Sequence, residues 1–499
     1  MVQRFFFFLL FSSSLLVAGS FSLDQISSSF PSKGFEDEVE FWKEIFTEYG
    51  DREVLIHDQN DVRLIYEVVR FAKGVRDDDV EYKRQHKELK KREKQWQQLF
   101  EEIRRYGSDS EKLTGKHKKI IHLLESHGYS PSSSLLRQLG RNIRFQRGIK
   151  EKFREGLIRS GQYLSKIETI FQAHGLPTEL ALLPHVESSF DYGAYSKRGA
   201  AGIWQFIRGT GRRYMKINRS VDERLDPLKS SEAAARLFRE NYDTLESWPL
   251  AVTAFNHGTN GMARAKKRVG ADMGKIIQEY QSRSFGFASK NFYVEFLAAV
   301  SVARNYSDYF GPLEFASPRP YDTLSLKRSH RLSHFTQIQG LTEEILRDYN
   351  PHIMADVWQR SKILPAGIEI HLPHGQGETI AAVLETVPAA SGPILVADNG
   401  SMGYRVQDGD TLLVIANRVG SSVSTLQLAN NLSNPDRIYP GQFLLVSEAS
   451  ARPTQYRVRP GDTLIEIASK FSTSLRQLQS MNLIDDPHLI FLGQVLLIP

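Results

Sequence analysis

Apolar residues recur at helical spacing through most of the first 315 positions, which predicts a mainly helical chain. Residues 41–49 and 62–72 show the three- and four-residue spacing of amphipathic helices. Residues 77–105 are nearly all charged or amide, with a thin apolar stripe, and predict a long surface helix or a helical hairpin. The helical pattern continues over 135–171. It would place four arginines on one positive ridge, namely Arg137, Arg141, Arg144 and Arg147. We interpret this ridge as solvated rather than bound to an anionic polymer.

A chain of 499 residues is too long for one hydrophobic core, so three or four folded units are expected. Linker composition and periodicity suggest a helical N-terminal region of unassigned role, a second helical unit, and small repeated modules towards the C-terminus. The predicted boundaries are a signal peptide at 1–20, the N-terminal region at 21–160, the second helical unit at 161–315, a degenerate module at 316–375, linkers at 376–401 and 448–453, and full modules at 402–447 and 454–499.

The N-terminus combines a basic residue, Arg4, with a short apolar run and then the small residues of 17–20, a pattern typical of a secretory signal peptide. The alternative is an uncleaved N-terminal anchor, and both predict export. Cysteine is absent, which excludes disulfides, thiolate nucleophiles, cysteine-based metal sites and a lipid-modified N-terminal cysteine. The net charge of +6 suits an anionic polymer without identifying it. Export argues against nucleic acid and leaves the cell wall and acidic lipid.

A carboxylate falls on the apolar face of a predicted helix near position 187. Leu180, Leu183 and Glu187 stand at i, i+3 and i+7, and Pro184 should kink the helix just before the glutamate. Loss of hydration in that setting favours the protonated carboxyl and raises its pKa, as a general acid near neutral pH requires. The alternative is a glutamate that ends a helix in water.

Several short motifs follow Glu187-Ser188 in a fixed order. These are Gly202-Ile203-Trp204-Gln205, then Ala254-Phe255-Asn256-His257-Gly258, then Asn291-Phe292-Tyr293. In combination they resemble the lysozyme-like domain of the soluble lytic murein transglycosylases over about 176–309. The resemblance implies a helical lysozyme-like fold that cleaves the glycan strands of peptidoglycan, with Glu187 as the catalytic acid and base. It also implies five substrate-binding residues: Ser188, Gln205, Phe255, Asn256 and Tyr293.

Position 255 departs from the pattern of that family. The family usually has a tyrosine there, whose hydroxyl is thought to hydrogen-bond the catalytic glutamate, whereas this chain has Phe255. Either Tyr293 supplies the missing hydroxyl from another helix, or burial alone tunes Glu187.

The resemblance implies chemistry with a single carboxylate, although most glycosidases use two. No second carboxylate matches the family motif, and Asp191 is the nearest in sequence. In the family, the N-acetyl group and the C6 hydroxyl of N-acetylmuramic acid take the second role. The implied product is a 1,6-anhydro sugar, formed without water, metal or cofactor. The alternatives are a hydrolysing muramidase of the same fold and an inactive glycan-binding scaffold.

The C-terminal part contains a direct repeat. Residues 404–412 recur as 456–464, and the alignment continues without a gap to the C-terminus. Each copy reads strand, turn, two short helices, strand. The repeat resembles LysM modules, which bind glycans containing N-acetylglucosamine. The resemblance implies glycan-binding positions in both copies: Gly409, Asp410, Thr411, Asn430, Gly461, Asp462, Thr463 and Asn482.

A weaker third copy runs from about 321 to 373. Gly340 and Asn350 align with Gly420 and Asn430 of the first full module, but the Gly-Asp-Thr-Leu element is missing. We therefore expect a structural brace against the preceding domain rather than a glycan-binding module.

The sequence thus predicts a multidomain, mainly α protein, with a lysozyme-like helical domain followed by small α+β (βααβ) LysM modules. The expected partner is peptidoglycan in the periplasm or cell envelope, with possible membrane association and no nucleic acid.

Overall fold

The computed structural model describes residues 28–387 without 77, 108–110, 356 and 362, and then 395–398, 401–406, 410–419, 421–430, 432, 434–435, 437–445, 454–459, 462–471, 473, 475–482, 484, 486, 490 and 494–498. The predicted signal peptide, the predicted linker at 448–453, Gly409 and Gly461 lie outside the described residues. The chain divides into two compact units, residues 1–384 and 385–499, which are considered separately.

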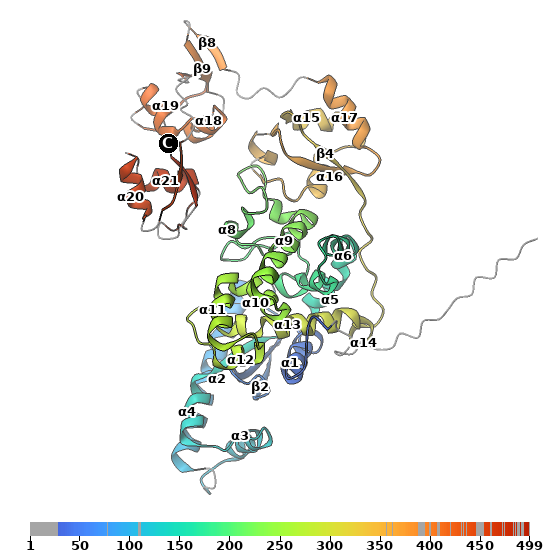
Figure 1. The fold of residues 1–499 in the computed structure, drawn as a ribbon, viewed down its shortest axis with the longest axis vertical. Helices are drawn as coiled ribbons and strands as arrows, with labels where there is room; N and C mark the ends of the chain where they lie inside the picture. The colour runs from blue at the N-terminus through green and yellow to red at the C-terminus, as the bar shows by residue number, and fades with distance from the viewer. Residues whose placement is uncertain are drawn as a thin grey trace, which may run out of the picture. The chain divides into compact units, whose positions relative to one another are not determined.

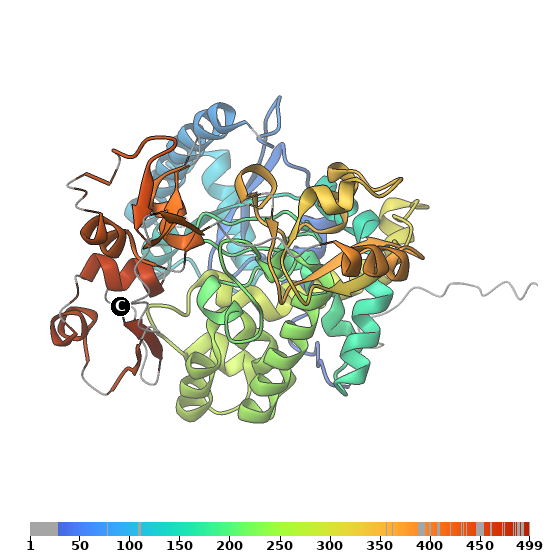
Figure 2. The same cartoon turned by 90° about the horizontal axis from the view of Figure 1, so that it is seen from above.

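A long helix, α13 (Phe287–Arg304), is central to the first unit. It is apolar and buried on almost every side, as a helix surrounded by others must be. It packs against α1 (Glu36–Thr47) and α10 (Trp248–His257). The helices of residues 227–279, drawn in green, form one group with it in Figures 1 and 2. Further helices of this part are α5 (Lys150–Ser160), α6 (Leu164–Ala173), α8 (Arg208–Gly211), α9 (Pro227–Leu245), α11 (Thr259–Val269), α12 (Met273–Glu279), α14 (Tyr306–Phe310) and the short 3-10 helix Glu223–Leu225.

An antiparallel three-stranded sheet and three helices form a second, smaller core before residue 150. The predicted long helix is present as α2, which begins where the Asp78 side chain accepts hydrogen bonds from the amides of Val80 and Glu81. The sheet has the order β2-β1-β3. The elements are β1 (Glu53–Asp58), β2 (Ile65–Arg70), α2 (Asp79–Tyr106), α3 (Gly115–Ser126), α4 (Ser133–Arg141) and β3 (Ile143–Arg147).

Two helical predictions in this region are wrong. Residues 65–70 and 143–147 are strands on either side of β1. The first is rich in β-branched residues, and pairing with β1 outweighs a helical spacing that short apolar runs leave ambiguous. The predicted positive ridge therefore ends with α4. The Arg144 guanidinium instead lies 3.8 Å from the centroid of the Phe287 ring.

The predicted boundary at residue 160 does not separate two cores. Phe46 of α1 stacks on Phe153 of α5 with ring centroids 4.7 Å apart, and Phe153 stacks in turn on His185 of the following domain. Phe30 and Phe46 belong to the same cluster of buried residues as Trp204 and the interior of α13. Part of the N-terminal region is thus built into the helical domain.

The predicted degenerate module has strand–helix–helix–strand order. Its outer strands, β4 (Tyr321–Ser325) and β7 (Glu369–Pro373), pair antiparallel around α15 (Leu332–Thr336) and α16 (Glu343–Tyr349). The module also contains β5 (His330–Arg331), β6 (Ile363–Leu364) and a π-helical turn, Val357–Ser361. The stretch predicted as the linker 376–401 begins with helix α17 (Gly377–Thr386), whose Ile380 and Leu384 are buried, so its first part is not a linker.

The second unit holds two modules, each with its own core. Their βααβ order confirms the predicted fold class. The first contains β8 (Leu395–Asp398), β9 (Ser401–Arg405), α18 (Leu412–Arg418), α19 (Val423–Ala429) and β10 (Phe443–Leu445); the second contains β11 (Thr454–Arg457), α20 (Leu464–Lys470), α21 (Leu475–Asn482) and β12 (Val495–Ile498). Within the described part of the chain, no helix combines the length and apolar character needed to cross a bilayer.

Candidate active site

Glu187 is the last residue of a short helix, and the backbone conformation of the residues after it ends that helix. The 3-10 helix Thr178–Leu182 leads into α7 (Pro184–Glu187), in which Pro184 occupies the first turn as its fixed φ allows. Ser189 and Phe190 then adopt φ values of 55° and 53°. These lie in the left-handed region, so the right-handed helix cannot continue past Glu187. Glu187 is half-buried at this point.

Burial raises the pKa of the Glu187 carboxyl to about 8, and the charge of Glu295 adds to the increase. Removal from water disfavours the carboxylate, and a nearby negative charge disfavours it further. Glu187 is therefore protonated at neutral pH, the state in which a general acid must wait for its substrate.

Glu295, in α13, is a second half-buried carboxylate that the sequence analysis missed. Burial raises its pKa to about 8 as well, while the charge of Arg144 acts in the opposite direction. Arg144 is itself half-buried and comes from β3 of the N-terminal region. A carboxylate inside the apolar run 292–302 carries the same signal that identified Glu187. The arginine, about 150 positions earlier, left no local signal.

Near pH 8, where both carboxyls lose their protons, the developing charge on Glu295 should extend the pH range in which Glu187 stays protonated. We expect Glu295→Gln to lower the pKa of Glu187, because the charged form of Glu187 loses a repulsive neighbour. A general acid fails as it deprotonates, so the alkaline limb of the pH–rate profile should move to lower pH. Each unit of movement costs about tenfold in rate above the pKa. Glu279→Gln, at an exposed position on α12, is the matched control and should leave the profile in place. An alkaline limb moved to higher pH by Glu295→Gln would contradict this account.

Ser188 and Gln205 connect the end of α7 to the turn 202–205. The Ser188 hydroxyl donates to the carbonyl of Ile203 at 2.9 Å. Gly202 has a φ of +75°, and a Cβ there would lie 1.8 Å from the Arg224 carbonyl oxygen, so this turn requires glycine. The Gln205 amide nitrogen donates to the carbonyls of Gly202 (2.8 Å) and Ala194 (3.3 Å). A substrate contact from Gln205 therefore has its amide oxygen to use.

Phe255 and Asn256 lie at the end of α10. The half-buried Phe255 ring stacks on Phe238 with centroids 5.0 Å apart and contacts Trp204 at 6.0 Å. Asn256 is exposed, and its side-chain oxygen accepts a hydrogen bond of 2.8 Å from the Ser289 hydroxyl of α13. The aromatic contact and this hydrogen bond join α10 to the 202–205 turn on one side and to α13 on the other.

Tyr293 does not line a cleft or donate to Glu187, so that prediction is wrong. Its side chain is fully buried, and its hydroxyl donates to the Pro31 carbonyl at 2.9 Å. Residues two apart on a helix point in different directions, so Tyr293 and Glu295 cannot share a face of α13. In the described part of the chain, burial and the Glu295 charge account for the raised pKa of Glu187, with no contribution from a hydrogen bond.

The described LysM positions are used inside their own modules. Asp410 and Asp462 accept hydrogen bonds from the hydroxyls of Tyr404 and Tyr456, at 2.7 and 2.8 Å. Thr411 and Thr463 cap the helices α18 and α20.

Asn430 and Asn482 each tie a helix to the last strand of the module. Asn430 donates to the carbonyls of Leu426 and Leu445 and accepts from the Leu445 amide, and Asn482 repeats the arrangement with Leu478 and Leu497. Both amide hydrogens are thereby used, which leaves these asparagines no donor for a glycan. Asn350 makes the same bridge to β7 in the degenerate module, at 2.7 and 2.6 Å from the His371 backbone.

Comparisons with known proteins agree with this architecture. The family model of the transglycosylase SLT domain matches residues 167–278, and that of the LysM domain matches 404–447 and 456–499. The chain is 30% identical over 348 residues to membrane-bound lytic murein transglycosylase D of Escherichia coli strain K12, covering 65% of this chain and 74% of that protein. It is also 35% identical over 111 residues to the N-acetylmuramoyl-L-alanine amidase sle1 of Staphylococcus saprophyticus, covering 21% of this chain and 33% of the amidase.

Among solved structures, the Bacillus cereus spore cortex-lytic enzyme SleL aligns with 28% identity over 19% of this chain and 22% of its own, with a TM-score of 0.09 that carries no weight for the fold. The extended match to transglycosylase D and the two family models cover the helical domain that carries Glu187 and the C-terminal repeat. The chain therefore belongs to the lytic murein transglycosylases, peptidoglycan-degrading enzymes, and combines an SLT catalytic domain with two LysM modules.

Proposed function

We propose that this enzyme cleaves the β-1,4 bond between N-acetylmuramic acid and N-acetylglucosamine without water and leaves 1,6-anhydro-N-acetylmuramic acid ends. The observation that carries the proposal is a half-buried, protonated Glu187 at the end of α7, beside the 202–205 turn of an SLT domain. One such residue can serve as the acid and then as the base.

In the proposed reaction, Glu187 first donates its proton to the glycosidic oxygen, and the bond between that oxygen and C1 of N-acetylmuramic acid breaks. The N-acetyl group of the same sugar stabilises the positive charge that develops at C1. The oxygen of the C6 hydroxyl then bonds to C1, and the ionised Glu187 accepts the proton that this hydroxyl loses. Glu187 is thereby restored to its acid form. The substrate supplies every bonding partner, so the step needs neither water nor a second catalytic carboxylate.

Gln205, Phe255 and Asn256 remain our proposed substrate-binding residues. Asn256 is exposed at the end of α10, and the Gln205 turn is fixed to Glu187 through the Ser188 hydrogen bond. We assign Ser188 the role of positioning Glu187, since its hydroxyl is buried and already bonded to Ile203.

Hydrolysis by the same fold is the second candidate. In that reaction Glu295 would be the base that activates water, as the second carboxylate of an ordinary glycosidase is. Its raised pKa argues against that role, since a base must be ionised at the working pH, and a carboxyl with a pKa of about 8 is mostly protonated at neutral pH.

Analysis of products tests the proposal. We expect mass spectrometry of fragments released from purified peptidoglycan to show anhydro ends. Reducing ends would identify a hydrolysing muramidase, and the absence of any release would identify an inactive scaffold.

We further propose that the enzyme acts in the periplasm or cell envelope, where its substrate lies, and that the LysM modules hold it on the cell wall. The two modules have separate cores and form a unit distinct from the catalytic part. Exposed apolar side chains at equivalent positions, Leu413 and Ile465, offer surface on which sugar rings can pack.

The tail 402–499 alone should sediment with purified peptidoglycan. Tethered modules gain from effective concentration, so a tail that lacks residues 448–499 should be retained about tenfold less well or worse. Binding isotherms on insoluble peptidoglycan measure both. Cleavage of short soluble fragments by the full chain should change little when a module is deleted, because those fragments do not need to be anchored. A tail that stays in the supernatant would refute the binding role.

A further inference from the structure

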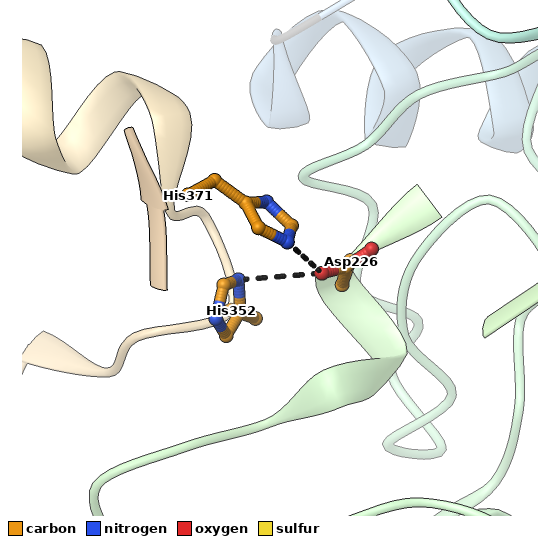
Figure 3. A group of neighbouring side chains, drawn as sticks. All are labelled: Asp226, His352 and His371. Carbon is orange, nitrogen blue, oxygen red and sulfur yellow. Dashed lines mark ion pairs between the residues drawn. The ribbon is translucent and has the colours of Figure 1, made fainter. Parts of the chain in front are cut away.

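Three buried side chains meet where the catalytic domain contacts the degenerate module (Figure 3). Asp226 precedes α9, His352 follows α16 and His371 lies in β7. The Asp226 Oδ2 atom lies 3.3 Å from Nε2 of His371 and 3.7 Å from Nδ1 of His352. The three potential ligand atoms are all within 4.8 Å of one another, and the residues are 0%, 1% and 6% exposed.

Hydrogen bonding within the protein does not account for these atoms. Asp226 uses Oδ1 to accept from the amides of Leu228 and Lys229, which caps α9, but its buried Oδ2 has no hydrogen-bond partner. The buried Nδ1 of His352 likewise has none. Buried polar atoms are nearly always paired, so two unpaired atoms that face each other indicate a missing partner.

The side of the His352 imidazole that faces away from Asp226 is fixed. The Nε2 atom of His352 lies 3.1 Å from the Glu369 carbonyl oxygen. A carbonyl accepts a hydrogen bond from an imidazole N–H, which leaves the other nitrogen of a neutral ring with its lone pair. In this state His352 points the lone pair of Nδ1 towards Oδ2 of the Asp226 carboxylate, and Nε2 of His371 lies 3.3 Å from the same oxygen. That is the arrangement by which backbone carbonyls orient histidines around a metal.

We propose that Asp226, His352 and His371 bind a divalent transition metal, with Zn²⁺ the best match, at the joint between the catalytic domain and the degenerate module. Two imidazoles and one carboxylate suit zinc, whereas calcium and magnesium prefer oxygen ligands. The 3.3 and 3.7 Å separations are close to those between ligands that each lie about 2.0–2.2 Å from one tetrahedral ion.

The metal would reinforce a joint that is already defined by backbone contacts. The Asp222 amide donates to the His352 carbonyl at 2.7 Å, and the Met354 amide donates to the Ser220 carbonyl at 2.9 Å. Lys229 adds an ion pair to Glu369 at 2.6 Å. The metal is thus structural, and it fixes the degenerate module as a brace on the segment that begins α9.

The test uses the full chain, without a histidine tag, after metals have been removed with a chelator. We expect Co²⁺ to bind in a one-to-one complex with visible absorption bands, Zn²⁺ to displace it, and the unfolding temperature to rise with Zn²⁺ concentration. Asp226→Asn should weaken binding at least about tenfold while it keeps the oxygen that caps α9. His352→Gln and His371→Gln should do the same.

His374→Gln is the matched control, because His374 is an exposed histidine at the end of the same module. The chain has 14 histidines, so metal bound elsewhere would be unaffected by changes in the cluster. Failure of Co²⁺ and Zn²⁺ to bind the unaltered protein would overturn the proposal. Binding that is equally strong in Asp226→Asn, whose fold is checked by circular dichroism, would overturn it as well.

Discussion

Glu187→Gln is expected to abolish glycan cleavage and to leave the fold and glycan binding unchanged. The amide is nearly isosteric with the carboxyl but can neither donate an acidic proton nor accept one afterwards. Loss of general acid–base catalysis costs about 10²–10⁴-fold, and one residue here serves both steps, so the loss should reach the upper end of that range. Release of soluble fragments from peptidoglycan measures it.

The control is Glu179→Gln, the same change eight positions earlier at another half-buried glutamate. It should cleave peptidoglycan at the rate of the unaltered enzyme. Residual activity of Glu187→Gln within about tenfold of the parent would show that Glu187 is not the acid.

Arg224→Met should destabilise the catalytic unit by about 3–5 kcal/mol, because it leaves the buried carboxylate of Asp222 without its partner. The two side chains are 2% and 3% exposed and form a two-pronged ion pair at 2.6 and 2.8 Å. Arg224 also donates to the carbonyls of Gly199 and Phe206, which flank the Gln205 turn, so cleavage should fall together with stability.

Tryptophan fluorescence during urea unfolding measures this effect selectively, because all five tryptophans precede residue 384. Arg213→Met is the control. It removes the same type of side chain from an exposed ion pair with Glu240, where about 0–1 kcal/mol is at stake. An Arg224→Met protein as stable as this control would contradict the role of the buried pair. Asp222→Asn combined with Arg224→Met should recover part of the loss, since no charge then stays buried alone.

Local patterns predicted the parts of the site that depend on few neighbours in sequence. The spacing of Leu180, Leu183 and Glu187 was enough to expect a desolvated carboxyl, and the raised pKa of Glu187 agrees with it. The C-terminal repeat was readable because two copies of one pattern lie in register in the same chain.

Predictions failed where distant residues decide the outcome. Residues 65–70 and 143–147 are strands because each pairs with β1, and neither pairing is visible in a single segment. Glu295 belongs to α13 and Arg144 to β3, so the two residues whose charges interact lie far apart in the sequence. Tyr293 matched the family order, but the face of α13 on which it lies is set by the packing of residues 30–35, where Pro31 accepts its hydroxyl.

The same limit applies to the glycan-binding positions. Asn430 and Asn482 are part of a recurring pattern, and recurrence alone does not distinguish a residue that binds ligand from one that closes the module. The structure assigns them the second role, because their amides bridge a helix to a strand in both modules.

The central claim is that Glu187 works as acid and then as base while the substrate's own hydroxyl replaces water. Digestion of purified peptidoglycan in water enriched in heavy oxygen, followed by mass spectrometry of the new chain ends, tests this claim most directly. The account predicts anhydro ends that carry no heavy oxygen and whose formation stops in Glu187→Gln. Reducing ends labelled with heavy oxygen would contradict it, since they would show that water, rather than the C6 hydroxyl, attacks C1.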